Sequence, residues 1–159
     1  MDRLELLRVL RTFERFGVEY VLIGATAMGF HDVVRATRDV DVILRASPEN
    51  LERLRQALRD LYPGDENIEQ IRDDDLLGDY PAVRYFPPGD GLFFDLLTRL
   101  GEAANYESVA SEWKEIDGIR VRVATAHALY RLKKDTLRPL DRQDAAMLAQ
   151  RFGFKDDQE

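Results

Sequence analysis

The sequence predicts an α/β (α+β) fold, a mixed β-sheet with flanking helices and a C-terminal helical part from about residue 125 to 152. Apolar residues recur at helical spacing near both ends of the chain, short β-branched runs stop at glycine, and two turn-forming clusters separate pairs of apolar runs. With 159 residues, of which 45% are hydrophobic, the chain is expected to form one domain over residues 1–159.

The first elements alternate between helix and strand. Apolar residues from Leu4 to Phe13 follow a helical spacing, and Gly17 supplies a C-terminal stop. Residues 18–23 are short, β-branched and apolar, which predicts a buried strand that ends at Gly24. The small residues that follow favour a short helix over 25–31.

A second strand and a long helix are expected next. Residues 39–44 are rich in Val and Ile and predict a strand. Ser47 is placed to cap a helix with Pro48 at its first position, and leucines at helical spacing extend that helix to about Tyr62. The acidic residues 63–79 lack periodicity and are expected to form a solvated loop without chemistry.

Two hairpins and a pair of helices complete the prediction. The turn-forming cluster 87–91 separates apolar runs at 82–86 and 92–97, and Asp117-Gly118 favours a tight turn between 112–116 and 119–123. Thr125 can then cap a helix that contains Leu129, Leu132 and Leu137. We expect Pro139 to interrupt this helix, and residues 141–152 to form the final one.

Composition excludes several classes of site and partner. The chain has no cysteine, which rules out disulfides, zinc-thiolate sites and thiol nucleophiles. No apolar run reaches the length of a membrane span, and the charged N-terminus lacks the apolar core of a signal peptide, so we expect a cytoplasmic protein with no membrane partner. The net charge of −7 argues against general nucleic-acid binding, although residues 119–142 hold seven basic and two acidic side chains.

Three aspartates are candidate metal ligands and catalytic residues. Asp39 and Asp41 share one face of the predicted strand, because successive side chains alternate, and Asp95 lies in a later apolar run. Like charges this close are costly unless a proton or divalent cation neutralises them. If the strands are adjacent, the three carboxylates can hold two Mg²⁺ ions about 4 Å apart, with Mn²⁺ as a second choice, as in phosphoryl-transfer sites. The alternative is an exposed acidic pair at a sheet edge.

These residues resemble the nucleotidyltransferase superfamily of DNA polymerase β type. Its pattern is a strand, a Gly-Gly or Gly-Ser turn that opens a helix, a strand with Asp-x-Asp, and a third carboxylate on a later strand. Gly24-Ala25, Asp39-x-Asp41 and Asp95 occupy these places. More narrowly, Arg35-x-Thr37 before the aspartates, with Lys133, Arg138 and Asp141-x-x-Asp144, is similar to the stand-alone bacterial toxins of AbiEii type.

The resemblance implies a nucleotidyltransferase core that moves a nucleoside monophosphate from a nucleoside triphosphate to an acceptor hydroxyl. The acceptor implied by the toxin group is RNA, such as the 3′ end of tRNA, and the implied protein partner is an antitoxin. The basic residues that would face the RNA are Arg120, Arg122, Arg131, Lys133, Lys134, Arg138 and Arg142. The residues implied to bind the nucleotide are Gly24, Ala25, Thr26, Thr37, Lys133 and Asp141.

Several of these residues have a structural alternative. Thr37 either binds phosphate or caps the bend before the second strand. Lys133 either binds phosphate or is an ordinary exposed lysine on a helix surface. Asp141 is also a good residue for the first turn of a helix. Arg35 is free to pair with Asp39.

Ala25 leaves a second function open. The family pattern has Gly or Ser at this turn position, so Ala25 favours a catalytically inactive binding or regulatory protein of the same fold. The three retained carboxylates favour the enzyme.

Overall fold

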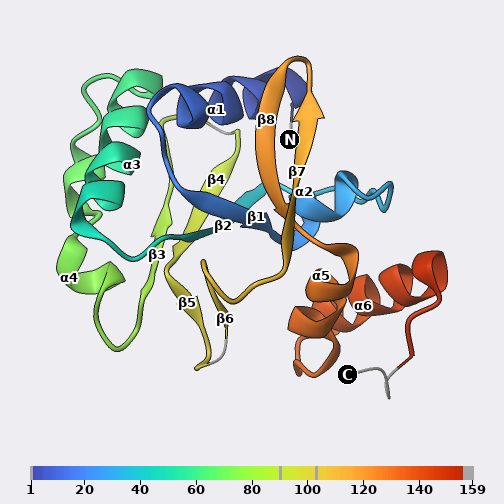
Figure 1. Cartoon of the computed structure of the whole chain (residues 1–159). Helices are drawn as coiled ribbons and strands as arrows, with labels where there is room; N and C mark the ends of the chain where they lie inside the picture. The colour runs from blue at the N-terminus through green and yellow to red at the C-terminus, as the bar shows by residue number, and fades with distance from the viewer. Residues whose placement is uncertain (1, 90, 103, 156–159) are drawn as a thin grey trace.

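One six-stranded mixed sheet organises the chain (Figure 1). The computed structural model describes residues 2–89, 91–102 and 104–155. The strands lie in the order β3-β4-β2-β1-β8-β7. Their bounds are β1 Tyr20–Ile23, β2 Asp39–Leu44, β3 Ala82–Tyr85, β4 Phe93–Leu97, β7 Ser111–Ile116 and β8 Ile119–Ala124. Two further short strands, β5 Arg99–Leu100 and β6 Ala104–Asn105, form a separate pair that the sequence pattern did not indicate.

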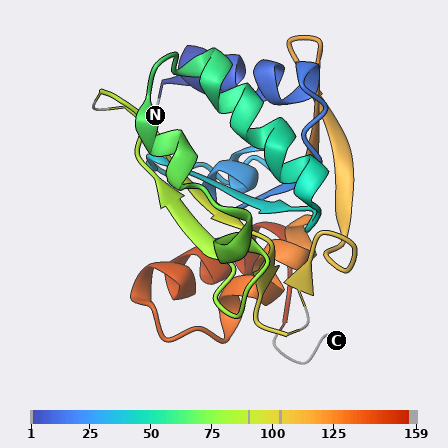
Figure 2. The same ribbon diagram turned by 90° about the vertical axis from the view of Figure 1, so that its left-hand side faces the viewer.

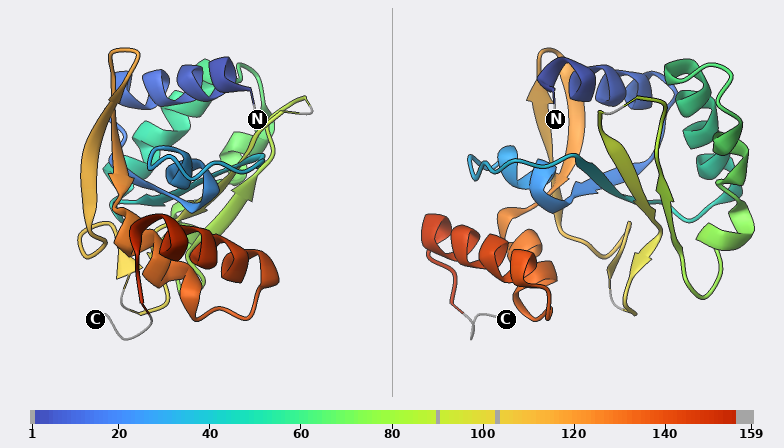
Figure 3. Two further views of the ribbon diagram at one scale, coloured as in Figure 1. Left: turned by 90° about the vertical axis from the view of Figure 1, so that its right-hand side faces the viewer. Right: turned by 180° about the vertical axis from the view of Figure 1, so that it is seen from behind.

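Helices lie on both sides of this sheet (Figures 2 and 3). Helices α1 (Arg3–Arg15) and α3 (Pro48–Leu61) pack together on one side, and α5 (Ala126–Lys134) and α6 (Pro139–Phe152) lie on the other. The short helix α2 (Gly24–Gly29) directly follows β1. The predicted fold class, a mixed sheet with flanking helices, is confirmed.

Apolar and acidic side chains alternate along the central strands, so one face of the sheet is apolar and the other is polar. In β2 and β4, Val40, Val42, Phe94 and Leu96 are fully buried. The ring of Phe94 lies 6.1 Å from that of Phe13 in α1. Because neighbouring side chains of a strand point to opposite faces, the aspartates between these residues point away from α1, toward the side of α5 and α6.

The predicted caps and hairpins are confirmed. The Ser47 hydroxyl accepts a hydrogen bond from the backbone N–H of Asn50 at 3.1 Å, at the start of α3. Strands β3 and β4 pair antiparallel, as do β7 and β8. Asp117 and Gly118 both have positive φ, 49° and 79°, which is the backbone of a type I′ turn. The other predicted turn, 87–91, includes residue 90, which lies outside the described residues.

Three element predictions were wrong. Residues 63–79 contain a 3₁₀ helix, Glu66–Gln70, and the short helix α4, Asp73–Leu76, because Ile68 and Leu76 insert into the core and fix local turns. Helix α5 ends at Lys134, which leaves Leu137 outside any helix. Helix α6 begins at Pro139 rather than at Asp141, since the fixed φ of proline suits a first helical position.

None of the helices within the described residues is long and apolar enough to cross a membrane.

Candidate metal and nucleotide site

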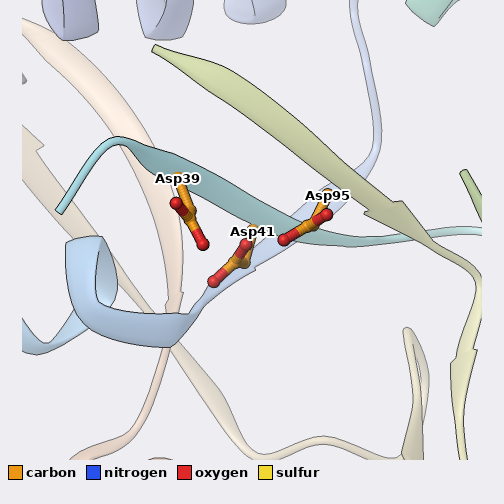
Figure 4. Close-up of side chains that lie close together, drawn as sticks. All are labelled: Asp39, Asp41 and Asp95. Atoms are coloured by element: carbon orange, nitrogen blue, oxygen red, sulfur yellow. The ribbon is translucent and has the colours of Figure 1, made fainter. Parts of the chain in front are cut away.

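The parallel pairing of β2 with β4 brings the three predicted carboxylates together. Asp41 lies directly opposite Asp95 in the register, and Asp39 lies one pleat earlier on the same face. Figure 4 shows the three side chains close together beside β2 and β4. One oxygen from each carboxylate can be chosen so that all three lie within 4.8 Å of one another. This is the spacing that a shared cation requires.

The half-buried Asp41 has the most strongly raised pKa of the three aspartates. Its Oδ1 atom is buried and has no hydrogen-bond partner in the described part of the chain. Burial, followed by the hydrogen bond with Asp95 and the negative charges of Asp95 and Asp39, raises the pKa of Asp41 to about 8. Burial and the charge of Asp95 also raise the pKa of Asp39. Three hard oxygen donors with one unsatisfied atom fit a divalent cation such as Mg²⁺ or Mn²⁺.

Gly24 makes room for Asp41. Its φ is +73°, a backbone conformation that side chains disfavour, and a Cβ at this position would lie 2.1 Å from Asp41 Oδ2. The glycine at the end of β1 is therefore required by the position of the carboxylate as well as by the turn.

The two residues after Gly24 have other surroundings. The Thr26 hydroxyl donates a hydrogen bond to the backbone carbonyl of Asp39 at 2.8 Å, and so holds the start of β2. Ala25 and Thr26 are both buried, and they line a different cavity from the one beside the carboxylates. The structure does not bring these two side chains to the aspartates.

A cleft of about 650 Å³ runs between the polar face of the sheet and the C-terminal helices. Thr37, Lys133 and Asp141 line it together with Gly24 and the three aspartates. The Thr37 hydroxyl accepts a hydrogen bond from the backbone N–H of Asp39 at 3.2 Å, which is the bend-capping contact considered above. Asp141 accepts a hydrogen bond from the Thr136 hydroxyl at 3.0 Å.

A buried ion cluster ties the C-terminal helices to the segment before β2. Arg35 binds both carboxylate oxygens of the fully buried Asp144, at 2.6 and 2.9 Å, and Lys133 donates to the same carboxylate. Burial raises the pKa of Asp144, but the hydrogen bonds from Arg35 and Lys133 outweigh it and hold that pKa below its usual value. The suggested pairing of Arg35 with Asp39 was therefore wrong, because Asp144 offers a bidentate partner. Lys133 is buried, so it is not an exposed lysine on a helix surface.

Arg84 is a site residue that sequence reasoning missed. Its Nε donates to Asp95 Oδ1 at 2.7 Å, and it lines the same cleft. The hairpin of 82–86 with 92–97 was predicted, but the antiparallel register that places Arg84 opposite Asp95 comes from the structure. Of the seven basic residues named for RNA contact, Lys133 and Arg138 line the cleft, whereas Arg120 and Arg122 lie on β8 against the rings of Trp113 and Tyr106.

Comparison with known proteins identifies the fold. No family model matches the chain, and no curated protein matches its sequence. The structure is similar to that of an antigenic nucleotidyltransferase-like protein from Paracoccidioides brasiliensis, with a TM-score of 0.54 and 14% sequence identity, over 94% of this chain and 76% of that one. A likeness at this identity is a likeness of fold alone. The chain has a nucleotidyltransferase-like fold that carries an acidic cluster able to bind metal.

Proposed function

We propose that the protein is a divalent-metal-dependent nucleotidyltransferase, which transfers a nucleoside monophosphate from a nucleoside triphosphate to an acceptor hydroxyl. The observation that carries this proposal is the convergence of the carboxylates of Asp39, Asp41 and Asp95, one of which has an unsatisfied buried oxygen, on a nucleotidyltransferase-like fold. Arg84 and a proton on Asp41 offset part of the repulsion among these carboxylates, and a divalent cation would neutralise the cluster more fully.

The three aspartates would hold Mg²⁺, or Mn²⁺ in its place. The bound metal would offset phosphate charge and activate the acceptor hydroxyl. Gly24 keeps the space beside Asp41 open, and Arg84 fixes one oxygen of Asp95, so the carboxylates are oriented before the nucleotide arrives.

The triphosphate would lie along the cleft toward the C-terminal helices. Lys133 and Arg138 line this side of the cleft, and the side chain of Arg138 is largely exposed. Asp144 holds Lys133 in place through a buried ion pair, which lowers the entropy lost when the lysine meets a phosphate. Thr37 lines the cleft beside Asp39 and completes the proposed nucleotide contacts.

For the acceptor we propose an RNA 3′ end, such as that of tRNA. The excess of basic residues over 119–142 supports it, and so does the resemblance to toxin nucleotidyltransferases. An antitoxin protein is the partner that this resemblance implies.

The proposal is tested by measuring transfer of a labelled nucleotide to RNA. The protein is incubated with each α-labelled nucleoside triphosphate, Mg²⁺ or Mn²⁺, and total cellular RNA, with Asp41→Asn as the control. Labelled RNA from the wild type and none from the variant is the expected result. Equal labelling by both proteins would overturn the mechanism. Metal-dependent nucleotide binding without transfer to any acceptor would instead identify a nucleotide-binding module, the alternative that Ala25 favours.

A further inference from the structure

The polar face of the sheet changes character one pleat beyond the aspartates. In the register, Arg84, Asp95 and Asp41 form a charged row across β3, β4 and β2. In the next row Ala82 lies opposite Leu97. Leu100 of β5, in the separate strand pair, lines the same cleft. The floor of the cleft is thus ionic at the carboxylates and aliphatic beyond them.

The helical side of the cleft has a matching apolar part. Leu132 of α5 and Leu140 of α6 line the same cavity as Leu97 and Leu100. Leu100 is 40% exposed and Leu140 is 45% exposed. A flat apolar group that fills the space between two apolar walls buries their surface, and this burial makes its binding free energy more favourable. We call Leu97, Leu100, Leu132 and Leu140 the leucine slot.

The occupant follows from the position of the slot. Leu97 stands two residues beyond Asp95 on one strand, which is about 7 Å along the sheet. A nucleotide whose phosphates lie at the carboxylates carries its base one ribose further on, at a comparable reach. A nucleobase is planar and has apolar faces, which suits a slot between two aliphatic walls.

We propose that the leucine slot receives the base of the donor nucleotide and accepts all four bases with little selectivity. This inference rests on the proposed function and adds the substrate range. Leucine side chains contain no hydrogen-bonding group, so the four leucines contact the faces of a base without reading its edges. Of the polar side chains that line the cleft near Leu132 and Leu140, Thr136 and Asp141 hydrogen-bond each other. Apolar contacts alone discriminate between similar ligands far less than hydrogen-bonding sites do. Purines should bind somewhat more tightly than pyrimidines, because two rings bury more apolar surface.

The experiment compares nucleotides with a ligand that has no base. Calorimetric titration of the full chain in Mg²⁺ uses ATP, GTP, CTP, UTP and inorganic tripolyphosphate. We expect the four nucleotides to agree within about tenfold and all to bind more tightly than tripolyphosphate. Leu140→Asn should weaken all four nucleotides about fivefold to tenfold and leave tripolyphosphate binding unchanged. The matched control is Leu137→Asn, because Leu137 is 85% exposed and does not line the cleft.

The outcomes separate this inference from the function beneath it. One nucleotide that binds more than a hundredfold better than the others would overturn it, as would nucleotides that bind no better than tripolyphosphate. An equal loss of tripolyphosphate binding in Leu140→Asn would do the same. If neither tripolyphosphate nor any nucleotide binds in the presence of metal, the proposed function itself fails, and the inference fails with it.

Discussion

Arg35 and Asp144, which are 109 positions apart in the chain, meet as a bidentate ion pair with contacts of 2.6 and 2.9 Å. The pair joins the segment before β2 to α6, and Lys133 shares its carboxylate. One buried negative charge therefore links the C-terminal helices to this segment, in addition to the core packing of Leu129 and Leu148.

Replacement of that charge tests its importance. Asp144→Asn would leave the buried Lys133 and the partly exposed Arg35 with no full negative partner at this position, and should lower the free energy of unfolding by about 3 kcal/mol in urea denaturation. The exposed pair of Arg72 with Asp74 gives the control, since Asp74→Asn should change stability by less than about 0.5 kcal/mol. Similar small effects of both substitutions would show that the buried cluster does not hold the helices.

The pKa of Asp41 makes the stability of the metal-free protein depend on pH. Its value of about 8 in the folded chain exceeds the value of about 3.9 in an unfolded chain, so the folded state retains the proton longer. The free energy of unfolding should then fall as the pH rises from about 4 to 8. Thermal melts in EDTA should show this fall for the wild type and a smaller one for Asp41→Asn, whose melting temperature should be higher by several degrees at pH 8.

Bound metal should offset the loss of stability at high pH. A cation needs the ionised carboxylates, so millimolar Mg²⁺ should raise the melting temperature of the wild type more at pH 8 than at pH 5. The shift should vanish in Asp41→Asn. A shift of equal size in that variant would place the bound ion elsewhere on the protein.

Gly24 offers a test that leaves every carboxylate in place. Gly24→Ala should push Asp41 aside and weaken metal affinity by at least about tenfold, because its Cβ would lie 2.1 Å from Asp41 Oδ2 at a φ of +73°. Gly29→Ala is the matched control in α2, as a Cβ there meets nothing within 4 Å. Isothermal titration with Mn²⁺ measures both. Unchanged affinity in Gly24→Ala would contradict the tight approach of turn and carboxylate.

Sequence reasoning succeeded where the controlling physics is local. The Ser47 cap, the Asp117-Gly118 turn and the alternation of Asp39 with Asp41 each depend on a few adjacent residues. The meeting of Asp95 with this pair was expected on the condition that their strands are neighbours, and the structure meets that condition.

The residues that sequence reasoning misplaced depend on distant partners. The partner of Arg35 lies on the last helix, and no spacing near Arg35 indicates it. Thr26 follows the expected glycine, but the turn directs its hydroxyl to the backbone of β2 instead of to the cleft. Short elements such as α4 and β5 have too few residues to show a periodic pattern in the sequence. Helix α4 forms where Leu76 packs into the core.

The parallel register of Asp41 with Asp95 has a consequence for how the protein assembles. Strand β4 reaches β2 as part of a hairpin with β3, so a nascent chain that has formed only β1 and β2 holds two of the three carboxylates. Full chelation would begin when the hairpin docks. Cation affinity is then a property of the paired strands β2 and β4 rather than of the Asp-x-Asp segment alone, and its onset reports the docking of the hairpin.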